Sequence, residues 1–230
     1  MHFLMSRGVG LLCVMFMLCG CVTKDLSHEN RQRVKTVWFK PAEFPLKSFQ
    51  FNSMTQALEA GVSAGSKAAS GTTLAPAVLA STSLANSRKA DETAMTPRQA
   101  IVLNMQQNGI DVGAMLRDRF KARVASEHVF LVVDDEAKAD AKIELIVSQW
   151  GVSLINFSKE LYPTMGVVAV MRRGGDEQIW RNFETITALS EGNDKAFTPE
   201  RYAADPDAIR SAFGRAVDLL TDKLMTDLKQ

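Results

Sequence analysis

The twenty residues at the amino terminus limit what this chain can fold into more than any other feature. They contain one basic residue, Arg7, and a largely apolar run from Val9 to Leu18. A run of about ten apolar residues is too short to cross a bilayer, which needs roughly twenty. A basic residue, a short apolar run and then small residues are typical of a secretory signal peptide. We therefore expect residues 1–20 to be removed and to form no part of the folded domain.

The cysteines lead to a further restriction on the domain. All three cysteines of the chain, Cys13, Cys19 and Cys21, lie within its first 21 residues. A domain that begins at Cys21 has no pair of thiols for a disulfide, although the periplasm would permit one. Core packing alone must therefore hold the domain together.

The residues around the cleavage point carry a family resemblance. Leu18-Cys19-Gly20-Cys21 resembles the lipobox of bacterial lipoproteins, with Cys19 a less usual occupant of its small position. The resemblance implies cleavage before Cys21, diacylglycerol on its thiol and a further acyl chain on the new amino terminus. Because Val22, and not aspartate, follows the anchor, the resemblance also implies sorting to the outer membrane, facing the periplasm. The alternative is a plain apolar helix whose cysteines occur by chance.

Charge argues against one class of partner. The 27 Lys and Arg residues include Arg7, so the chain from Cys21 onward carries 26 basic and 26 acidic residues. A neutral balance lacks the clustered basic excess that nucleic-acid binding needs. The length is sufficient for one good core, with some residues left for an insert.

Composition divides the remaining chain into three parts. Residues 21–33 are mostly polar and are expected to be a tether. Residues 34–56 and 91–230 are expected to form a single α+β domain. Residues 57–90 are rich in Ala, Gly, Ser and Thr, which indicates a low-complexity insert. Within them Gly61 and Gly65 fit the small-xxx-small pattern of helices that pack closely in membranes, so contact with a membrane or another copy is the alternative.

Strand patterns account for most of the predicted domain. Val34–Phe39 alternates and predicts a first strand, and the apolar run Val129–Val133 predicts a strand buried on both faces. Lys142–Val152 predicts a longer strand. Met165–Met171 and Gln178–Leu189 predict two strands joined by a hairpin turn at Arg172–Glu177, where Gly-Gly suits the turn.

Helix signals complete the fold prediction. Asp111 is a suitable cap for an amphipathic helix ending near Val124, and Asp205-Pro206 introduces a second one from Ala208 to Leu228. Thr96-Pro97 also predicts a helix start, although the residues that follow it fit either a helix or a short strand. The prediction is an α+β fold, with a mainly antiparallel sheet of four to five strands and two amphipathic helices packed on one face.

The order of these elements resembles a broad group of bacterial envelope lipoproteins. The resemblance covers residues 34–45 and 98–229 and includes the strand start Ala139–Leu145. The group includes the lipopolysaccharide-assembly lipoprotein, auxiliary lipoproteins of ABC transport systems, the amino-terminal domain of the Tol-system translocation protein and the curli-export lipoprotein. The chain is more similar still to uncharacterised proteobacterial lipoproteins. The insert at 57–90 departs from this pattern.

Catalytic patterns are missing from the sequence. Its three histidines are His2, His28 and His128, and none stands in a metal-binding or nucleophile-activating spacing. The acidic run Asp134–Glu136 fits a solvated turn better than a metal site. We therefore expect no enzymatic activity, no metal and no cofactor other than the covalent lipid.

Four residues are candidates for contact with a partner. Arg172 and Arg173, at the predicted hairpin tip, could meet an anionic group, or could simply keep the end of the sheet polar. Trp150 and Trp180 lie in predicted strands, where they belong either to the core or, if exposed, to an interface.

Together these patterns predict a lipid-anchored, non-catalytic protein of the envelope. It would hold an envelope protein or lipid at a free sheet edge or at the helix-free face, as a binding or assembly factor of a transport system. The alternative is a self-associating export or pore-forming lipoprotein that uses residues 57–90. An envelope hydrolase with scattered catalytic residues is a third hypothesis.

Overall fold

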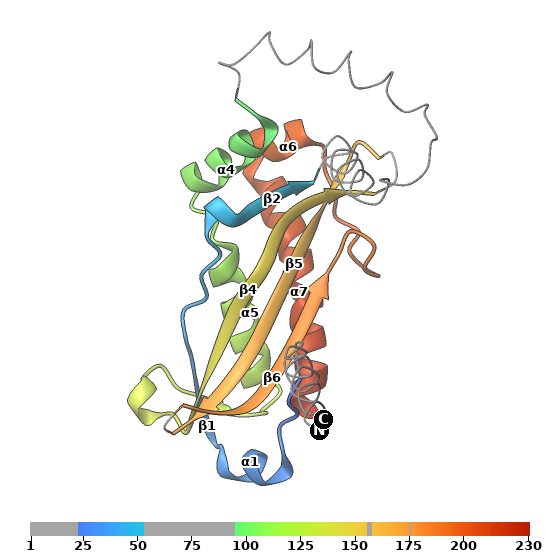
Figure 1. The fold of residues 1–230 in the computed structure, drawn as a ribbon. Helices are drawn as coiled ribbons and strands as arrows, with labels where there is room; N and C mark the ends of the chain where they lie inside the picture. Colours follow the sequence, from blue (N-terminus) through green and yellow to red (C-terminus); the bar gives the residue numbers. More distant parts are fainter. Residues whose placement is uncertain (1–22, 53–94, 156–157, 175) are drawn as a thin grey trace, which may run out of the picture.

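The computed structural model describes residues 23–52, 95–155, 158–174 and 176–230. Three long strands, β4 (Ala141–Leu154), β5 (Leu161–Arg173) and β6 (Glu177–Ile186), form an antiparallel sheet. Two helices, α5 (Val112–Ser126) and α7 (Pro206–Lys229), pack together behind one face of it (Figure 1). The predicted α+β class, with two helices on one face, is confirmed.

Three short strands join the sheet by parallel pairing. β1 (Thr36–Phe39) pairs with the start of β4 and with β3 (Leu131–Val132), while β2 (Phe49–Asn52) pairs with the end of β4. The described residues therefore form a six-stranded sheet in the order β3-β1-β4-β5-β6, with β2 beside β4. The sheet has more strands than the four to five predicted, because β2 was not expected: its short sequence does not encode its pairing with β4.

The core forms between the sheet and the two helices. On α7 the buried residues recur at three- and four-residue steps, from Ile209 to Leu228, and this stripe packs against β5 and β6. At the centre, the ring of Trp150 makes edge contacts with Phe49, Phe44 and Phe213, with centroids 5.0, 5.6 and 5.9 Å away. This aromatic cluster joins β4 to β2 and α7.

The remaining helices begin at residues that the sequence marks as caps. α4 (Pro97–Gln107) begins with a capping box in which Thr96 and Gln99 each accept a backbone N–H from the other. The residues after Pro97 therefore form a helix and not a strand. α6 (Pro199–Ala204) is capped by Thr198, and Asp205 caps α7. Two short 3-10 helices, η2 (Leu46–Ser48) and η3 (Glu136–Lys138), lie in the connections.

Arg98, in the first turn of α4, ties that helix to β2. Its Nε donates to the carbonyl of Phe49 and its Nη2 to the carbonyl of Lys47, both at 2.9 Å. The start of α4 is therefore fixed beside the start of β2. The predicted insert, residues 57–90, lies outside the described residues, as does the lipobox from Leu18 to Cys21.

The prediction for Val129–Val133 is wrong in part. Only Leu131 and Val132 form a strand, and Leu131 is 67% exposed. The run lies at the edge of the sheet, where β1 is its only strand partner among the described residues. Phe130 is buried, so one side of the run contributes to the core and the other faces solvent.

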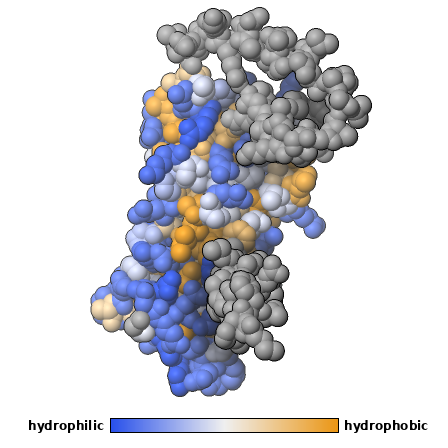
Figure 2. All heavy atoms as spheres, viewed as in Figure 1, coloured by the Kyte–Doolittle hydropathy of each residue, from blue (hydrophilic) through white to orange (hydrophobic). Residues whose placement is uncertain are grey.

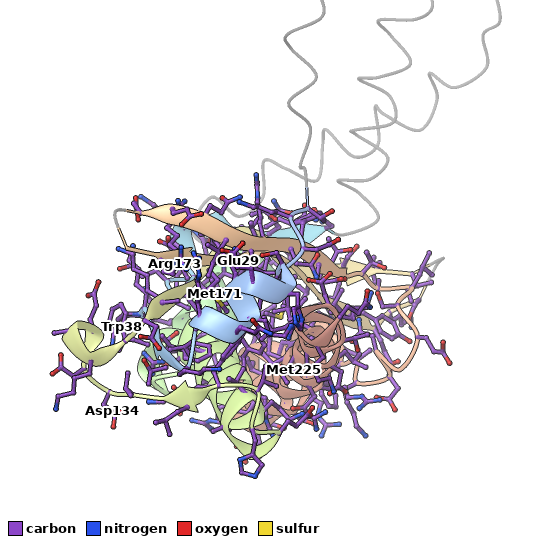
Figure 3. The ribbon with its side chains drawn as sticks, turned by 90° about the horizontal axis from the view of Figure 1, so that it is seen from below. Glu29, Trp38, Asp134, Met171, Arg173 and Met225 are labelled. Carbon is purple, nitrogen blue, oxygen red and sulfur yellow. The ribbon has the colours of Figure 1, made fainter. Side chains whose placement is uncertain are left out.

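The segment predicted as a tether is folded from Lys24 onward. It contains a helix, α1 (His28–Arg33), that is capped by Ser27. The residues on either side of this helix, Leu26 and Val34, are buried in the core. α1 crosses the end of the sheet in the view from below (Figure 3). The sequence did not predict that this segment packs against the core, because it is mostly polar and only two isolated apolar residues make the contact.

Asp140 closes the start of the sheet. Its carboxylate accepts the backbone N–H groups of Lys35 at 2.8 Å and Thr36 at 2.9 Å, just before β1. These backbone hydrogen bonds hold the pKa of Asp140 below its ordinary value. These hydrogen bonds of Asp140, next to the start of β4, therefore link β4 to the start of β1.

We predict a pH-dependent effect of Asp140→Asn on stability. Because the folded pKa is lowered, the stabilisation is present above the unfolded pKa of about 3.9 and is lost as the pH falls through the lower folded value. Since the carboxylate is largely exposed, we expect a loss of only about 1 kcal/mol in the free energy of unfolding at pH 7. Urea unfolding at several pH values would measure it, and a difference that persists unchanged in strong acid would contradict a role for the charge.

Candidate functional site

The face of the sheet opposite α5 and α7 is a candidate surface for binding. In the described part of the chain no helix packs on this face, which is turned toward the viewer in Figure 1. Figure 2 shows apolar residues gathered in the middle of it, among polar ones. We call it the helix-free face.

An apolar row crosses the helix-free face. Ile146 of β4 is paired with Val168 of β5, which is paired in turn with Phe183 of β6. Their side chains therefore lie side by side on three neighbouring strands. Ile146 is 42% exposed, whereas the other two are partly buried. The row of three, which we call the apolar row, ends at the outer edge of β6.

A hollow of about 430 Å³ lies on the same face, toward the ends of β2 and β4. We call it the neutral hollow, because none of the described residues that line it carries an ionisable side chain. Amide and hydroxyl groups supply its polar part, and aliphatic side chains supply the rest. The polar residues are Gln50, Asn52, Gln149, Ser153, Thr164 and Thr187, and the aliphatic ones are Leu154, Ile155, Ile186, Ala188 and Leu189.

Two local features build the neutral hollow. Gly151 lets β2 approach β4 closely, since a Cβ at this position would lie 2.0 Å from the carbonyl oxygen of Gln50. On the other side, the buried amide of Asn193 donates to the carbonyls of Pro163 at 3.0 Å and Thr187 at 2.9 Å. These bonds hold the segment after β6 against the end of β5. Leu189, which is 78% exposed, lies on the rim.

One described segment pairs with the outer edge of β6. Lys24 and Arg181 exchange two backbone hydrogen bonds of 2.8 Å in an antiparallel bridge. The alternation of a strand directs the backbone groups of Phe183 and Thr185 to the same side as those of Arg181. Among the described residues no backbone group pairs with these two, and we call this part the open edge of β6.

The predicted arginine pair lies at the β5–β6 hairpin, but its charge is neutralised locally. Arg173 pairs with Glu177 at 3.1 Å, and Arg172 approaches Asp176 at 3.9 Å. Lys142 lies 3.6 Å from Asp176 as well. These residues surround a hollow of only about 170 Å³. Balanced charge in so small a space favours the alternative that the pair keeps the sheet end polar.

The two tryptophans belong to the core. Trp150 is 1% exposed and Trp180 is 0% exposed, so neither is available as a surface anchor for a partner. Trp150 donates to the hydroxyl of Ser48 at 3.1 Å, and Trp180 donates to the carboxylate of Asp227 at 2.7 Å. Both tryptophans therefore belong to the core, and the interpretation that places them at an exposed interface is wrong.

No three His, Cys, Asp or Glu side chains of the described residues are placed to hold a metal ion. In the acidic run, Asp134 is exposed and pairs with Lys121 at 2.7 Å, which also lowers the pKa of Asp134. Burial raises the pKa of Tyr202, whose hydroxyl donates to the carbonyl of Leu161 at 2.9 Å in a structural contact.

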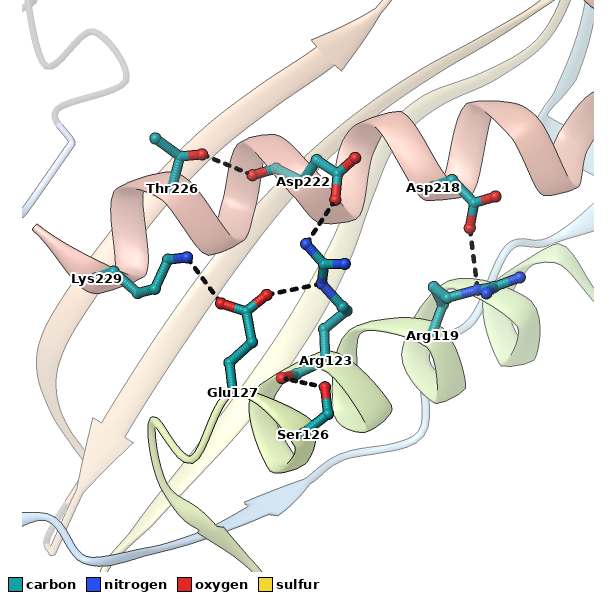
Figure 4. Close-up of polar contacts among 8 residues, drawn as sticks. All are labelled: Arg119, Arg123, Ser126, Glu127, Asp218, Asp222, Thr226 and Lys229. Carbon is teal, nitrogen blue, oxygen red and sulfur yellow. Dashed lines mark hydrogen bonds and ion pairs between the residues drawn. The ribbon is translucent and has the colours of Figure 1, made fainter.

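The outer surface of the helices differs in character from the helix-free face. Ion pairs join α5 to α7 along their seam: Arg119 to Asp218 at 3.0 Å and Arg123 to Asp222 at 3.1 Å (Figure 4). At its end Glu127 accepts from Lys229 at 2.7 Å, and this bond lowers the pKa of Glu127. Exposed pairs of this kind add little stability and mark a solvated surface.

A second hollow, of about 460 Å³, lies between residues 42–46 and the turn from α4 to α5. Side chains of the core, including Trp150 and Met105, form its floor. Glu43 and Asp111 are on its lining, but Asp111 is already the cap of α5. This hollow is a gap between packed elements and lies away from the open edge of β6.

None of the helices among the described residues combines the length and the apolarity that a helix needs to cross a bilayer.

Comparison with known proteins gives only low similarity. The chain matches no protein-family model and no curated protein sequence. A Xanthomonas campestris protein of the DUF330 family is 17% identical with a TM-score of 0.36, over 50% of this chain and 61% of that protein. A candidate lipoprotein from Caulobacter crescentus is 20% identical with a TM-score of 0.35, over 51% and 80% of the two chains. The lipoprotein GNA1162 from Neisseria meningitidis is 13% identical with a TM-score of 0.26, over 84% and 99%.

Two of these three proteins are named as lipoproteins, and none is named as a lipopolysaccharide-assembly or curli-export protein. Similarity this low carries no function over to this chain.

Proposed function

We propose that this chain is a non-catalytic, lipid-anchored protein of the bacterial envelope. It holds an envelope protein or lipid on its helix-free face, as a binding or assembly factor of a transport system. The observation that carries this proposal is the neutral hollow beside the open edge of β6. Mixed amide, hydroxyl and aliphatic lining suits an uncharged ligand surface with a few hydrogen-bonding groups.

The chemistry of the hollow supports binding over catalysis. The hydroxyls of Ser153, Thr164 and Thr187 are weak nucleophiles unless a neighbouring base takes their proton. Among the described residues the lining offers no base, since its other polar groups are the amides of Gln50, Asn52 and Gln149. Amides donate and accept hydrogen bonds without titrating.

The proposed lipid anchor and the proposed location in the cell both follow from the lipobox resemblance. Leu18, Gly20 and Cys21 support acylation of Cys21, and Val22 supports outer-membrane sorting with the domain in the periplasm. More than one acyl chain gives the stable attachment that a single chain cannot.

Site-specific crosslinking in cells tests the binding surface. A photoreactive phenylalanine analogue placed at Leu189, on the rim of the hollow, is expected to capture a discrete envelope partner. Leu131 on β3 is a matched control, because it is an exposed leucine that does not line the hollow. Equal products at both positions, or none at Leu189, would contradict the proposed surface. A product of two copies of this chain would favour the self-associating alternative, whose segment, residues 57–90, lies outside the described residues.

A further inference from the structure

The chain just after the expected anchor is fixed to the body of the domain. The N–H of Lys24 donates to the carbonyl of Arg181, and the N–H of Arg181 donates to the carbonyl of Lys24, each at 2.8 Å. The ammonium of Lys24 also donates to the carbonyl of Gln178. From here the chain continues through the buried Leu26 into α1. Lys24 is therefore held at the edge of β6.

This attachment limits where the lipid can be. Lys24 follows Cys21 by three positions, and an extended chain advances at most about 3.5 Å per residue. The Cα atom of Cys21 therefore lies within about 10 Å of that of Lys24, and the acylated sulfur is farther only by the length of the cysteine side chain. Because the bridge is antiparallel, Thr23 lies on the Phe183 side of Lys24. The lipid leaves the domain close to the open part of the β6 edge.

We propose that the β6 side of the helix-free face lies directly on the bilayer that holds the anchor. This inference rests on the proposed function, because it requires lipid on Cys21. The occupant of the apolar row and of the neighbouring edge is then the headgroup region of the membrane. The domain has one orientation and is not suspended on a flexible tether.

The chemistry of this surface fits a lipid headgroup layer. The apolar row ends at Phe183, where the anchored chain passes, and it offers aliphatic and aromatic surface to the boundary of the acyl chains. Lys24 and Arg181 lie beside it and complement anionic phosphates. The ion-paired seam of α5 and α7 lies on the other side of the sheet, where water solvates it. The neutral hollow is on the membrane-facing side, within reach of ligands at the bilayer surface.

Fluorescence quenching in vesicles tests this orientation. The sulfur of Cys21 is consumed by lipid and no cysteine follows it, so an introduced cysteine is the single reactive thiol. The full acylated chain, with an environment-sensitive fluorophore at Thr185→Cys, is reconstituted into vesicles of phosphatidylethanolamine and phosphatidylglycerol that contain spin-labelled lipid. The control fluorophore is at Ala122→Cys, an exposed position on α5. We expect several-fold stronger quenching at position 185 than at position 122.

A pair of substitutions at one position tests the role of the bridge. Lys24→Pro removes the backbone donor to Arg181, and we expect the quenching at position 185 to fall to the level of the control. Lys24→Ala keeps that donor, and we expect it to keep the difference. Equal effects of the two substitutions would overturn the bridge as the orienting contact.

The outcomes separate the two proposals. If mass spectrometry shows acylated Cys21 but quenching is equal at positions 185 and 122, the orientation is overturned and the lipid anchor stands. If energy transfer between copies replaces lipid quenching at position 185, a second copy covers this face and the orientation is likewise overturned. If Cys21 carries no lipid, both the orientation and the lipid-anchored function are overturned.

Discussion

Cys21→Ala is expected to move the protein from the membrane fraction to the soluble fraction. The proposed lipid comprises a diacylglyceryl group and an amide-linked acyl chain, and each buried CH₂ contributes about 0.8 kcal/mol of membrane affinity. Without the thiol, neither the diacylglyceryl transfer nor the steps that depend on it can occur. Cell fractionation and incorporation of labelled palmitate would measure the change. Palmitate incorporation that survives the substitution would contradict attachment at this cysteine.

Cys19→Ala provides the matched control for that experiment. It removes a cysteine two residues away and leaves another small residue at the same position of the lipobox, next to Gly20. We expect acylation and membrane attachment to persist. Loss of the lipid in both variants would mean that cleavage and acylation follow a different register from the one proposed.

Trp150→Ala is expected to cause the largest loss of stability in the folded domain, about 4 kcal/mol. The side chain is fully buried among Phe44, Phe49 and Phe213, so its removal leaves a large cavity. It also leaves the hydroxyl of Ser48 without its donor. Because small domains are stable by only about 5–15 kcal/mol, much of the protein would unfold in moderate denaturant. Urea unfolding followed by circular dichroism would measure the change.

Two further variants separate cavity formation from the lost hydrogen bond. Trp150→Phe keeps an aromatic ring but removes the N–H, and we expect a loss of roughly 1–3 kcal/mol. Leu189→Ala removes an exposed side chain and is expected to change the free energy of unfolding by less than about 0.5 kcal/mol. A small effect of Trp150→Ala, similar to that of Leu189→Ala, would contradict the central place of this ring in the core.

The helices could be predicted because their signals are local. Thr96, Asp111, Thr198 and Asp205 each precede a helix and cap it, and the apolar spacing of α7 matches its buried stripe. The β5–β6 hairpin was also local, since Gly174 and Asp176 lie in its turn. Such features depend on residues within four or five positions of one another.

Of the short strands, β1 was predicted from its own sequence, but β2 was not. β2 has four residues, and its position depends on parallel pairing with β4, about a hundred residues later. The exposure of Leu131 depends likewise on its place at the sheet edge. An apolar run shows that a segment is buried somewhere, but not how many neighbours it has.

The candidate site was the least accessible to sequence reasoning. The apolar row joins Ile146 to Phe183, and the bridge joins Lys24 to Arg181, so each depends on the register of distant strands. One signal was present: the imperfect alternation of the β6 segment, where Trp180 faces α7 and Phe183 lies on the opposite face. An apolar residue on each face of an edge strand indicates that both faces have something to cover them.

The contact of Arg98 with the carbonyls of Lys47 and Phe49 has a consequence for how the length of this chain can vary. It fixes the start of α4 beside the start of β2, whatever number of residues connects Asn52 to Met95. In general, the entropy cost of closing a flexible connection grows only logarithmically, by about 0.6 kcal/mol for each doubling of its length. We therefore expect a change in the number of codons between these two residues to leave the Arg98 contact and the neighbouring aromatic cluster in place.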